Sequence, residues 1–485
     1  MDKPGKTPLL NALIKHKRSN VTSFHMPGHK QGKGIDPRFA TQMRDNPFSF
    51  DMTEIPGLDD LHNPNSAIKE AQISAARVFG ASRTFFLING TTVGIQAAIL
   101  SVCKQGEEIL LPRDIHRSVI GACILSGAKP RYLPVRLNCD FLVPLPPTAD
   151  EVNLAIAQNP SVKAVFQVYP SYYGLAGDLA KVAQVAHRYN LPLIVDEAHA
   201  AHFAFSDRLP ETALKLGADI SIQSTHKTLG ALTQASMLHV AGNGVDCNEI
   251  SRQLSVLQTT SPSYLLMASL DAANWQMHVS GQALIEKTIN LSVQVRDKLG
   301  KIPGLRCMGS EILGQGIHAI DPTKLLLSVK DTGLTGYQVA ESLRRKYKIQ
   351  VELCDKYNIL CMFSLGNNAT DARKLVTALG DIVVTNRKPS PRGPYTELKL
   401  LPDPQIVLTP REAWFAPHKR VLLEKSIGQI AAEMLAPYPP GIPLFCPGEI
   451  ITYEIVQLVK QLKREACSFH GPTDQTLETV GIVDR

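Results

Sequence analysis

From about residue 83 to residue 240, short apolar runs alternate with segments in which apolar residues recur at helical spacing. Arg83–Ile88 is one such run, and Thr91–Cys103 after it carries an apolar helical face. The run Leu191–Val195 is apolar throughout, which is typical of a strand buried on both faces. The same alternation predicts further strands at Glu108–Leu111, Pro130–Val135, Val162–Val168, Ala218–Gln223 and Ser236–Val240, and helices at His116–Leu125 and Leu179–Tyr189. We therefore expect a large α/β domain whose mostly parallel sheet has helices on both faces.

The rest of the chain predicts smaller units around this domain. Residues 262–301 indicate long helices, and residues 324–383 indicate a smaller α+β domain. Residues 388–417 are rich in proline and indicate a linker or an extended wrap. Val421–Arg464 indicates a helix, a proline-rich loop and a second helix. The predicted units are an N-terminal arm (1–60), a large domain (61–310), a small α+β domain (311–387), and a C-terminal linker with a helical domain (388–485).

Charge and composition argue against several classes of protein. The chain has 51 Lys and Arg against 44 Asp and Glu, and a net charge of +7 over 485 residues is a weak argument for nucleic-acid binding. Two long uncharged stretches, Thr84–Cys103 and Gln253–Leu270, are interrupted by polar residues, so neither predicts a membrane span. No apolar signal core follows Met1, and nine cysteines without CxxC spacing suit a reducing interior. We therefore expect a cytoplasmic protein that binds neither nucleic acid nor membrane.

Three motifs that can carry chemistry each follow a predicted strand. At Asn89–Thr92, backbone N–H groups and hydroxyls at a helix start can bind a phosphate. Asp196 ends an apolar strand, where the ligand crevice of a parallel sheet lies, and Lys227 in Ser224–Lys227 offers an amine for a Schiff base. Taken singly, a helix cap, a structural ion pair and a surface lysine are the alternatives. Together they are the three anchors of pyridoxal phosphate, for its phosphate, ring nitrogen and aldehyde.

Seven segments resemble a known family. They are Phe24–Gly32 (FHMPGHKQG), Asn89–Thr92 (NGTT), Arg113–Ile120 (RDIHRSVI), Asp196–Phe203 (DEAHAAHF), Ser224–Val240 (STHKTLGALTQASMLHV), Thr259–Tyr264 (TTSPSY) and Pro437–Glu449 (PYPPGIPLFCPGE). They are similar to the ornithine/lysine/arginine decarboxylases of fold type I, and the similarity covers nearly the whole chain. The chain most resembles the shorter bacterial and cyanobacterial branch, which lacks the N-terminal wing domain of the large acid-stress enzymes and includes arginine decarboxylases.

The resemblance implies a role for individual residues. Lys227 would form the Schiff base with pyridoxal phosphate, and Asp196 would pair with the ring nitrogen. His116 would stack on one face of the ring, and Ala198 would pack on the other. The implied phosphate ligands are Gly90, Thr91, Thr92, Ser224 and His226, with Thr260 or Ser261 supplied by the partner subunit of a homodimer.

One position departs from the family pattern. His199 stands where the large enzymes have a tryptophan, and its role is open. Lys227, His199 and His226 are the candidates for returning a proton to the substrate after carbon dioxide leaves, with Lys227 favoured. A pair such as His199 and His202 without further ligands is poor support for a metal site, so we expect none.

The implied reaction is decarboxylation of a basic L-amino acid, with L-arginine ahead of L-lysine and L-ornithine. The cation at the far end of such a substrate calls for a carboxylate. The candidates are Glu352, Glu449, Asp59 and Asp60, with Asp51 and Glu54 in the same acidic run. An aminotransferase or carbon–sulfur lyase, and a non-catalytic relative that binds phosphate or nucleic acid, are the alternatives.

Overall fold

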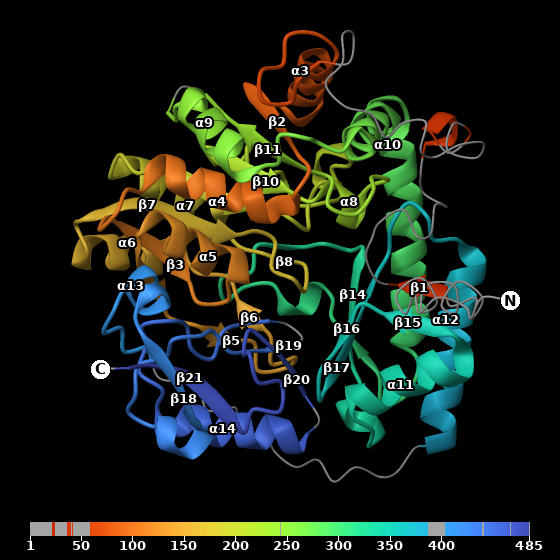
Figure 1. Cartoon of the computed structure of the whole chain (residues 1–485). Helices are drawn as coiled ribbons and strands as arrows, with labels where there is room; N and C mark the ends of the chain where they lie inside the picture. The colour runs from red at the N-terminus through yellow and green to blue at the C-terminus, as the bar shows by residue number, and fades with distance from the viewer. Residues whose placement is uncertain are drawn as a thin grey trace, which may run out of the picture.

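The computed structural model describes residues 22–24, 36–39, 41, 59–242, 244–386, 403–438, 441–465 and 467–484. Most of the predicted N-terminal arm lies outside the described residues, and so do Asp51 and Glu54. Figure 1 shows the central sheet between helices in the upper half of the molecule, with the small domain and the C-terminal residues side by side below it. The boundaries at residues 60, 310 and 387 stay predictions.

The large domain is built on a seven-stranded sheet in the order β2-β11-β10-β9-β7-β3-β4. These strands are β2 (Arg83–Leu87), β3 (Glu108–Pro112), β4 (Lys129–Leu133), β7 (Val162–Val168), β9 (Leu193–Asp196), β10 (Ile220–Gln223) and β11 (Ser236–Val240). Neighbouring strands from β10 to β4 pair in parallel, whereas β11 is antiparallel to both β10 and β2. All strands except β11 therefore run in one direction, which confirms the predicted mostly parallel sheet.

Helices cover both faces of this sheet. Those on one face share an apolar core with β3, β7 and β9, and they are α4 (Gly90–Val102), α5 (Arg117–Ser126) and α9 (Cys247–Leu257). Those on the other face are α3 (Ala67–Phe79), α6 (Ala149–Gln158), α7 (Leu179–Arg188) and α10 (Tyr264–Leu299). The segment expected to form long helices is thus one helix of 36 residues. Its last turns pack in the core of the small domain, so α10 joins the two domains.

The small domain is an antiparallel sheet, in the order β12-β14-β17-β16, packed with two helices. Its elements are β12 (Arg306–Cys307), β14 (Lys324–Ser328), β16 (Leu353–Cys354), β17 (Asn358–Met362), α11 (Gly336–Tyr347) and α12 (Ala369–Asn386). β15 (Ile349–Val351) lies beside them and pairs in parallel with β1 (Thr22–Phe24). β8 (Leu175–Ala176) of the large domain pairs with β13 (Ala319–Ile320), so hydrogen-bonded backbone joins the two domains. A short hairpin of β5 (Arg136–Leu137) and β6 (Pro144–Leu145) lies in the large domain.

The C-terminal residues differ from the expected linker and helical domain. Pro410–Phe415, inside the predicted linker, form helix α13, because Thr409 and Glu412 make a reciprocal capping box and Pro410 opens the helix. The first of the two predicted helices, at the start of Val421–Arg464, is wrong: Val421 and Leu422 end strand β18 (His418–Leu422), which pairs with β21 (Thr479–Val483), and Leu423–Ser426 form only a short 3₁₀ turn. The second is present as α14 (Tyr453–Arg464). With β19 (Ala436–Tyr438) paired to β20 (Ser468–His470), this part of the chain is mixed α+β.

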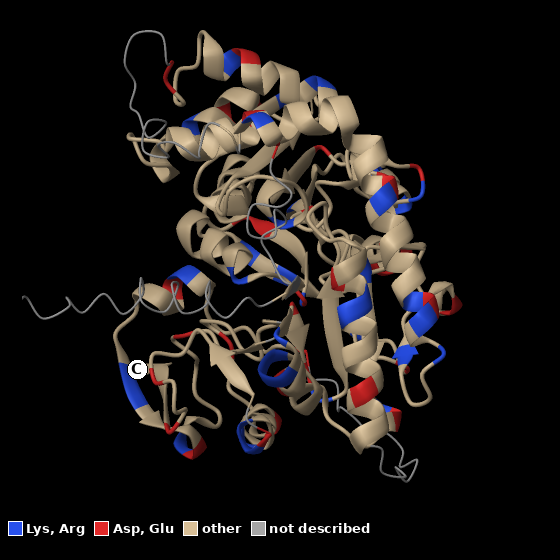
Figure 2. Cartoon of the chain, turned by 90° about the vertical axis from the view of Figure 1, so that its right-hand side faces the viewer, with Lys and Arg blue, Asp and Glu red and all other residues tan. Residues whose placement is uncertain are grey.

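Charged residues of both signs are interspersed along the helices in the view of Figure 2. The excess positive charge therefore does not gather on one face in this view. Among the described residues, none of the helices has both the length and the apolar character needed to cross a bilayer.

Candidate active site

The three motifs meet at the carboxyl edge of the central sheet. β9 ends in Asp196, β10 is followed by Ser224 and the one-turn helix α8 (Thr225–Thr228), and β2 is followed by α4. These strands run in the same direction, so their carboxyl ends lie at the same edge. The Oγ1 of Thr91 lies 3.1 Å from the Oγ of Ser224, although the two residues are 133 positions apart. The structure thus brings the first and third motifs into direct contact.

The start of α4 has the features of an anion site. Its N-cap residue Asn89 makes no side-chain capping hydrogen bond. Gly90 has φ +71°, a conformation that suits glycine, and a Cβ there would meet no atom within 4 Å. The backbone N–H of Gly90 donates to the carbonyl of Gln234 at 2.9 Å, which holds the turn in place. An uncapped helix start beside the hydroxyls of Thr91 and Ser224 is suited to a phosphate.

Lys227 and Asp196 are the titratable pair of this edge. Lys227 is half-buried, and removal from water lowers the pKa of its amine, while the charges of Asp196 and Glu352 act in the opposite direction. Burial raises the pKa of Asp196, and a positive charge on the nearby Lys227 opposes that rise whenever Lys227 is protonated. The Oδ1 of Asp196 accepts the backbone N–H of Ala198 at 3.1 Å, which orients the carboxylate. Both side chains of the sequence-predicted pair are therefore in reach of each other's charge.

The carboxylate beside Asp196 has a different task. Glu197 is fully buried and accepts hydrogen bonds from the Ala213 backbone N–H at 2.8 Å, the Gln223 amide at 2.8 Å and the Ser221 hydroxyl. Burial raises its pKa to about 7. Glu197, which follows β9, is therefore a structural residue that is hydrogen-bonded to β10 through Ser221 and Gln223.

His116 occupies the N-cap position of α5 and is accessible to solvent. Its Nδ1 accepts the backbone N–H of Ser118 at 3.2 Å, so the neutral ring carries its proton on Nε2. Partial removal of the ring from water, together with positive charge on Lys227, lowers its pKa. His116 is therefore neutral near pH 7, a state in which its ring can stack on an aromatic group.

A second lysine enters the site from the small domain. Lys324, the first residue of β14, has 1% of its surface exposed, and its Nζ lies 2.8 Å from the Nδ1 of His199. The Nε2 of the same histidine lies 3.1 Å from the Nζ of Lys227. Lys324 also donates to the carbonyl of Tyr172 at 3.0 Å. Sequence reasoning missed Lys324 and Tyr172, although a lysine that opens the apolar run Leu325–Leu327 was a usable signal.

A glycine makes room for Lys324, and this leads to a prediction on stability. Gly174 has φ +88°, and a Cβ there would lie 2.9 Å from the Cβ and Cγ of Lys324. We expect Gly174→Ala to lower the free energy of unfolding by about 2–4 kcal/mol, through left-handed strain and crowding together. Urea unfolding followed by circular dichroism measures the change. Gly80→Ala is the matched control, because Gly80 has φ +70° and open space, so strain alone should cost about 1–2 kcal/mol. Equal costs at the two positions would contradict crowding by Lys324.

The four acidic residues predicted to bind the substrate have different hydrogen-bond partners. Glu352 lies at the site, where it accepts the hydroxyl hydrogen of Tyr172 and its charge reaches Lys227. The predicted substrate-binding role of Glu449 is corrected, because both oxygens of its carboxylate accept hydrogen bonds from the buried Arg113 guanidinium, at 2.6 and 2.7 Å. The predicted substrate-binding role of Asp59 is corrected as well. Its carboxylate accepts hydrogen bonds from backbone N–H groups around the start of α3, and these lower its pKa to about 2. Asp60 accepts the backbone N–H of His62 at 2.8 Å and stays a prediction.

The remaining candidates contact their own surroundings. The ring Nδ1 of His226 lies 3.0 Å from the carbonyl oxygen of Ala235. Thr260 and Ser261 are exposed, and the Ser261 N–H donates to Thr259 at 3.2 Å. Their predicted role in a partner subunit's site stays a prediction, as do the roles of Thr92 and Ala198.

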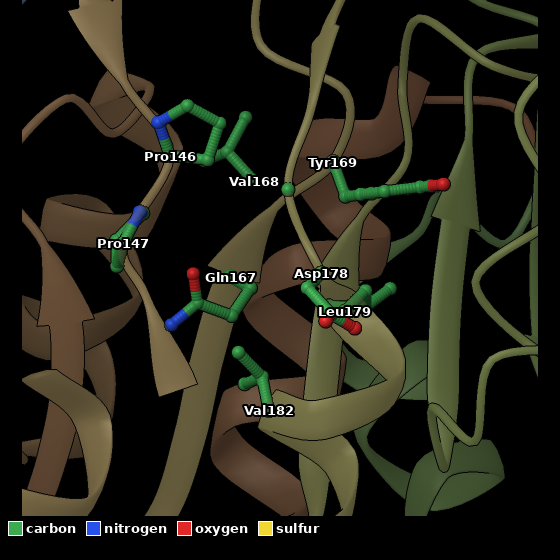
Figure 3. Close-up of a pocket in the computed structure, with 9 residues that line it drawn as sticks. Pro146, Pro147, Gln167, Val168, Tyr169, Asp178, Leu179 and Val182 are labelled. Carbon is green, nitrogen blue, oxygen red and sulfur yellow. The ribbon is translucent and has the colours of Figure 1, made fainter. Parts of the chain in front are cut away.

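A small pocket lies one strand away from Asp196. Figure 3 shows Gln167, Tyr169 and Val182 around it, with Pro146 and Pro147 on the opposite side. It opens at the carboxyl end of β7, where Val168 pairs with Asp196 in the sheet. None of the candidate site residues lines it, so we do not assign the reaction to this pocket.

Comparison with known proteins agrees with this architecture. The family model for the Orn/Lys/Arg decarboxylase major domain matches residues 7–371, and that for the C-terminal domain of the same family matches residues 396–476. Arginine decarboxylases of Bacillus anthracis and Bacillus subtilis are each 40% identical over 479 residues, which is 99% of this chain and 97% and 98% of theirs. The inducible lysine decarboxylase of Escherichia coli is 27% identical over 546 residues, covering 92% of this chain and 75% of that enzyme.

Solved structures extend the agreement to the fold. The constitutive lysine decarboxylase of E. coli superposes with a TM-score of 0.76 at 20% identity, over 98% of this chain and 82% of that one. L-threonine transaldolase from Pseudomonas fluorescens has a TM-score of 0.61 at 17% identity, over 79% and 88%. These likenesses confirm the predicted fold class. With two family models matched along most of its length, the chain belongs to the Orn/Lys/Arg decarboxylase family.

Proposed function

We propose that this protein decarboxylates a basic L-amino acid with pyridoxal phosphate as cofactor, and that L-arginine is preferred over L-lysine and L-ornithine. One observation carries the proposal: the Lys227 amine lies within reach of the Asp196 charge, at the sheet edge where Thr91 and Ser224 meet. The preference for arginine is supported by the relatives named arginine decarboxylase, which are 40% identical over 99% of the chain.

The residues at this edge fit the cofactor. The uncapped start of α4 with the Thr91 and Ser224 hydroxyls suits its phosphate, and the buried Asp196 carboxylate suits its protonated ring nitrogen. When bound, pyridoxal phosphate supplies an aldehyde that takes up an amino group and a ring that accepts the electron pair released as the carboxylate departs. With the cofactor bound, Lys227 would hold its aldehyde and Asp196 would keep the proton on the ring nitrogen. His116 and Ala198 would enclose the ring between them.

The return of a proton to the substrate falls to groups near Lys227. We favour Lys227 itself, because its Nζ already shares a hydrogen bond with His199. His199 can pass a proton along that bond, and its own ring is buried from solvent. His199 and His226 remain the alternative donors.

Glu352 is the acid in this chain that we assign to the far cation of the substrate. Its carboxylate accepts from the Tyr172 hydroxyl and its charge acts on Lys227, and a carboxylate can bind a guanidinium through two hydrogen bonds. Thr260 and Ser261 are exposed, which suits the proposed homodimer in which the partner subunit completes the phosphate site.

Release of labelled carbon dioxide from arginine, lysine and ornithine, measured side by side, tests both levels of the proposal. We expect the highest kcat/KM for arginine, and Glu352→Gln should lower it about 10- to 100-fold, because one charge-assisted hydrogen bond is lost. Glu341→Gln is the control, since Glu341 pairs with exposed arginines on α11. A better rate with lysine would overturn the ranking. Stoichiometric keto acid without carbon dioxide would indicate an aminotransferase instead.

A further inference from the structure

Three nitrogen-bearing side chains form a continuous row in the site. The Lys227 Nζ lies 3.1 Å from the Nε2 of His199, and the Nδ1 of His199 lies 2.8 Å from the Lys324 Nζ. His199 is buried, with 7% of its surface exposed, and lies between two amines. Burial lowers the pKa of His199 well below its usual range, and positive charge on a neighbouring lysine acts in the same direction. The imidazole is therefore neutral.

A neutral imidazole has one N–H and one lone pair, whereas an ammonium group can only donate. The two lysines therefore cannot both donate to His199. Either Lys324 is the ammonium and donates to Nδ1, while Nε2–H donates to a free amine at Lys227, or the two roles are exchanged. The hydrogen bonds at either end of the row decide between them.

The surroundings of Lys324 favour the ammonium at that end. Its Nζ donates to the Tyr172 carbonyl at 3.0 Å and lies 5.3 Å from the centre of the Tyr172 ring, a distance at which an aromatic face attracts a cation. Asp321, three residues earlier and fully buried, feels the Lys324 charge, which helps to lower the Asp321 pKa. At the other end, Lys227 needs a lone pair to act as a nucleophile.

We propose that Lys324 is a positioning residue: its ammonium fixes His199 as the Nε2–H tautomer, and Nε2–H in turn holds Lys227 as a free amine. Lys324 belongs to the small domain, and its loop is docked on the large domain by the Asp321 N–H, which donates to the Gly174 carbonyl at 2.8 Å. Docking of the small domain thereby sets the state of an amine at the edge of the central sheet. The proposal rests on the proposed role of Lys227 as the reactive amine.

Other charged groups face the same row and stay constant in the test. Lys227 also interacts electrostatically with Asp196, Glu352 and His116. His199 also interacts electrostatically with His116 and His226.

Competitive acetylation of the cofactor-free protein with acetic anhydride across pH 6–11, about the range in which lysines titrate, measures the midpoint of Lys227 by mass spectrometry. In Lys324→Met, Nε2 of His199 can become the acceptor of an ammonium at Lys227, so we expect the midpoint to rise by about 1–2 pH units. Lys324→Arg keeps a cationic donor and should restore the wild-type midpoint. In a His199→Phe background, Lys324→Met should cause no further shift. An unchanged midpoint in Lys324→Met, or an equal shift in the His199→Phe background, would overturn the proposal.

A second measurement does not depend on whether Lys324→Met folds. In wild-type protein with ¹⁵N-labelled histidine, the His199 resonances, assigned by their loss in His199→Phe, should show a protonated Nε2 and an unprotonated Nδ1. A protonated Nδ1 would overturn the proposal. Neither measurement uses cofactor or substrate, so failure of the decarboxylase assignment would be seen separately, as absence of carbon dioxide release with a normal Lys227 midpoint.

Discussion

Lys227→Ala is expected to lower kcat/KM for carbon dioxide release by at least about 10³-fold, because the variant lacks the amine that the proposed reaction uses at two steps. In the proposed reaction that amine would hold the cofactor aldehyde, and it is the favoured donor of the returning proton. The protein loaded with cofactor should also lose the visible absorbance of the Schiff base. Labelled carbon dioxide release and an absorbance spectrum measure the two effects.

Lys215→Ala is the matched control for this prediction. Lys215 lies in the same domain, but its side chain is 67% exposed and pairs with the exposed Glu211. We expect that variant to keep its rate within about twofold, since surface substitutions of this kind have small effects. Retention of more than about a tenth of wild-type activity in Lys227→Ala would contradict the assigned role.

Glu449→Gln is expected to lower the free energy of unfolding by about 3–5 kcal/mol, because it leaves the buried Arg113 guanidinium without its counter-charge. Arg113 and Glu449 are joined by two hydrogen bonds, and their side chains are 10% and 3% exposed. Urea unfolding measures the loss. Arg113 lies three residues before His116, so we also expect weaker cofactor binding, seen as a higher cofactor concentration for half-maximal activity.

An exposed pair of the same geometry is the control. Arg306 and Asp140 also make two hydrogen bonds, at 2.9 and 3.0 Å, but their side chains are 45% and 49% exposed. Asp140→Asn should cost no more than about 1 kcal/mol. Similar costs for the two variants would show that burial does not set the strength of the Arg113–Glu449 pair.

The C-terminal part shows where sequence patterns were insufficient. Helix α13 was overlooked because its proline content indicated a linker, although Thr409, Pro410 and Glu412 have the spacing of a capping box. Strand β18 (HKRVL) is largely exposed and lacks the apolar alternation of a strand. Its partner β21 lies about 60 residues later, as the pair Leu422–Thr479 shows, and no local pattern indicates such a pairing.

The acidic candidates differ for a related reason. By residue type, Asp59, Glu352 and Glu449 are equivalent carboxylates. Asp59 accepts hydrogen bonds from backbone N–H groups, Glu352 accepts one from a tyrosine hydroxyl, and Glu449 pairs with a buried arginine. The partner decides whether a carboxylate is structural or able to meet a substrate, and each of these partners except the backbone comes from a distant segment.

The amino-acid sequence by itself determined the seven strands of the central sheet, the helices α4, α5 and α7, and the placement of Gly90, Asp196 and Lys227 after their strands. These follow from periodicity and turn residues within a few positions, which are local properties. Only the tertiary structure decided what surrounds those residues. Lys324 meets His199 across 125 positions, and Thr91 meets Ser224 across 133. Hydrogen bonds act over about 3 Å, so the protonation of His199 and Lys227 depends on which distant side chains the fold brings into contact.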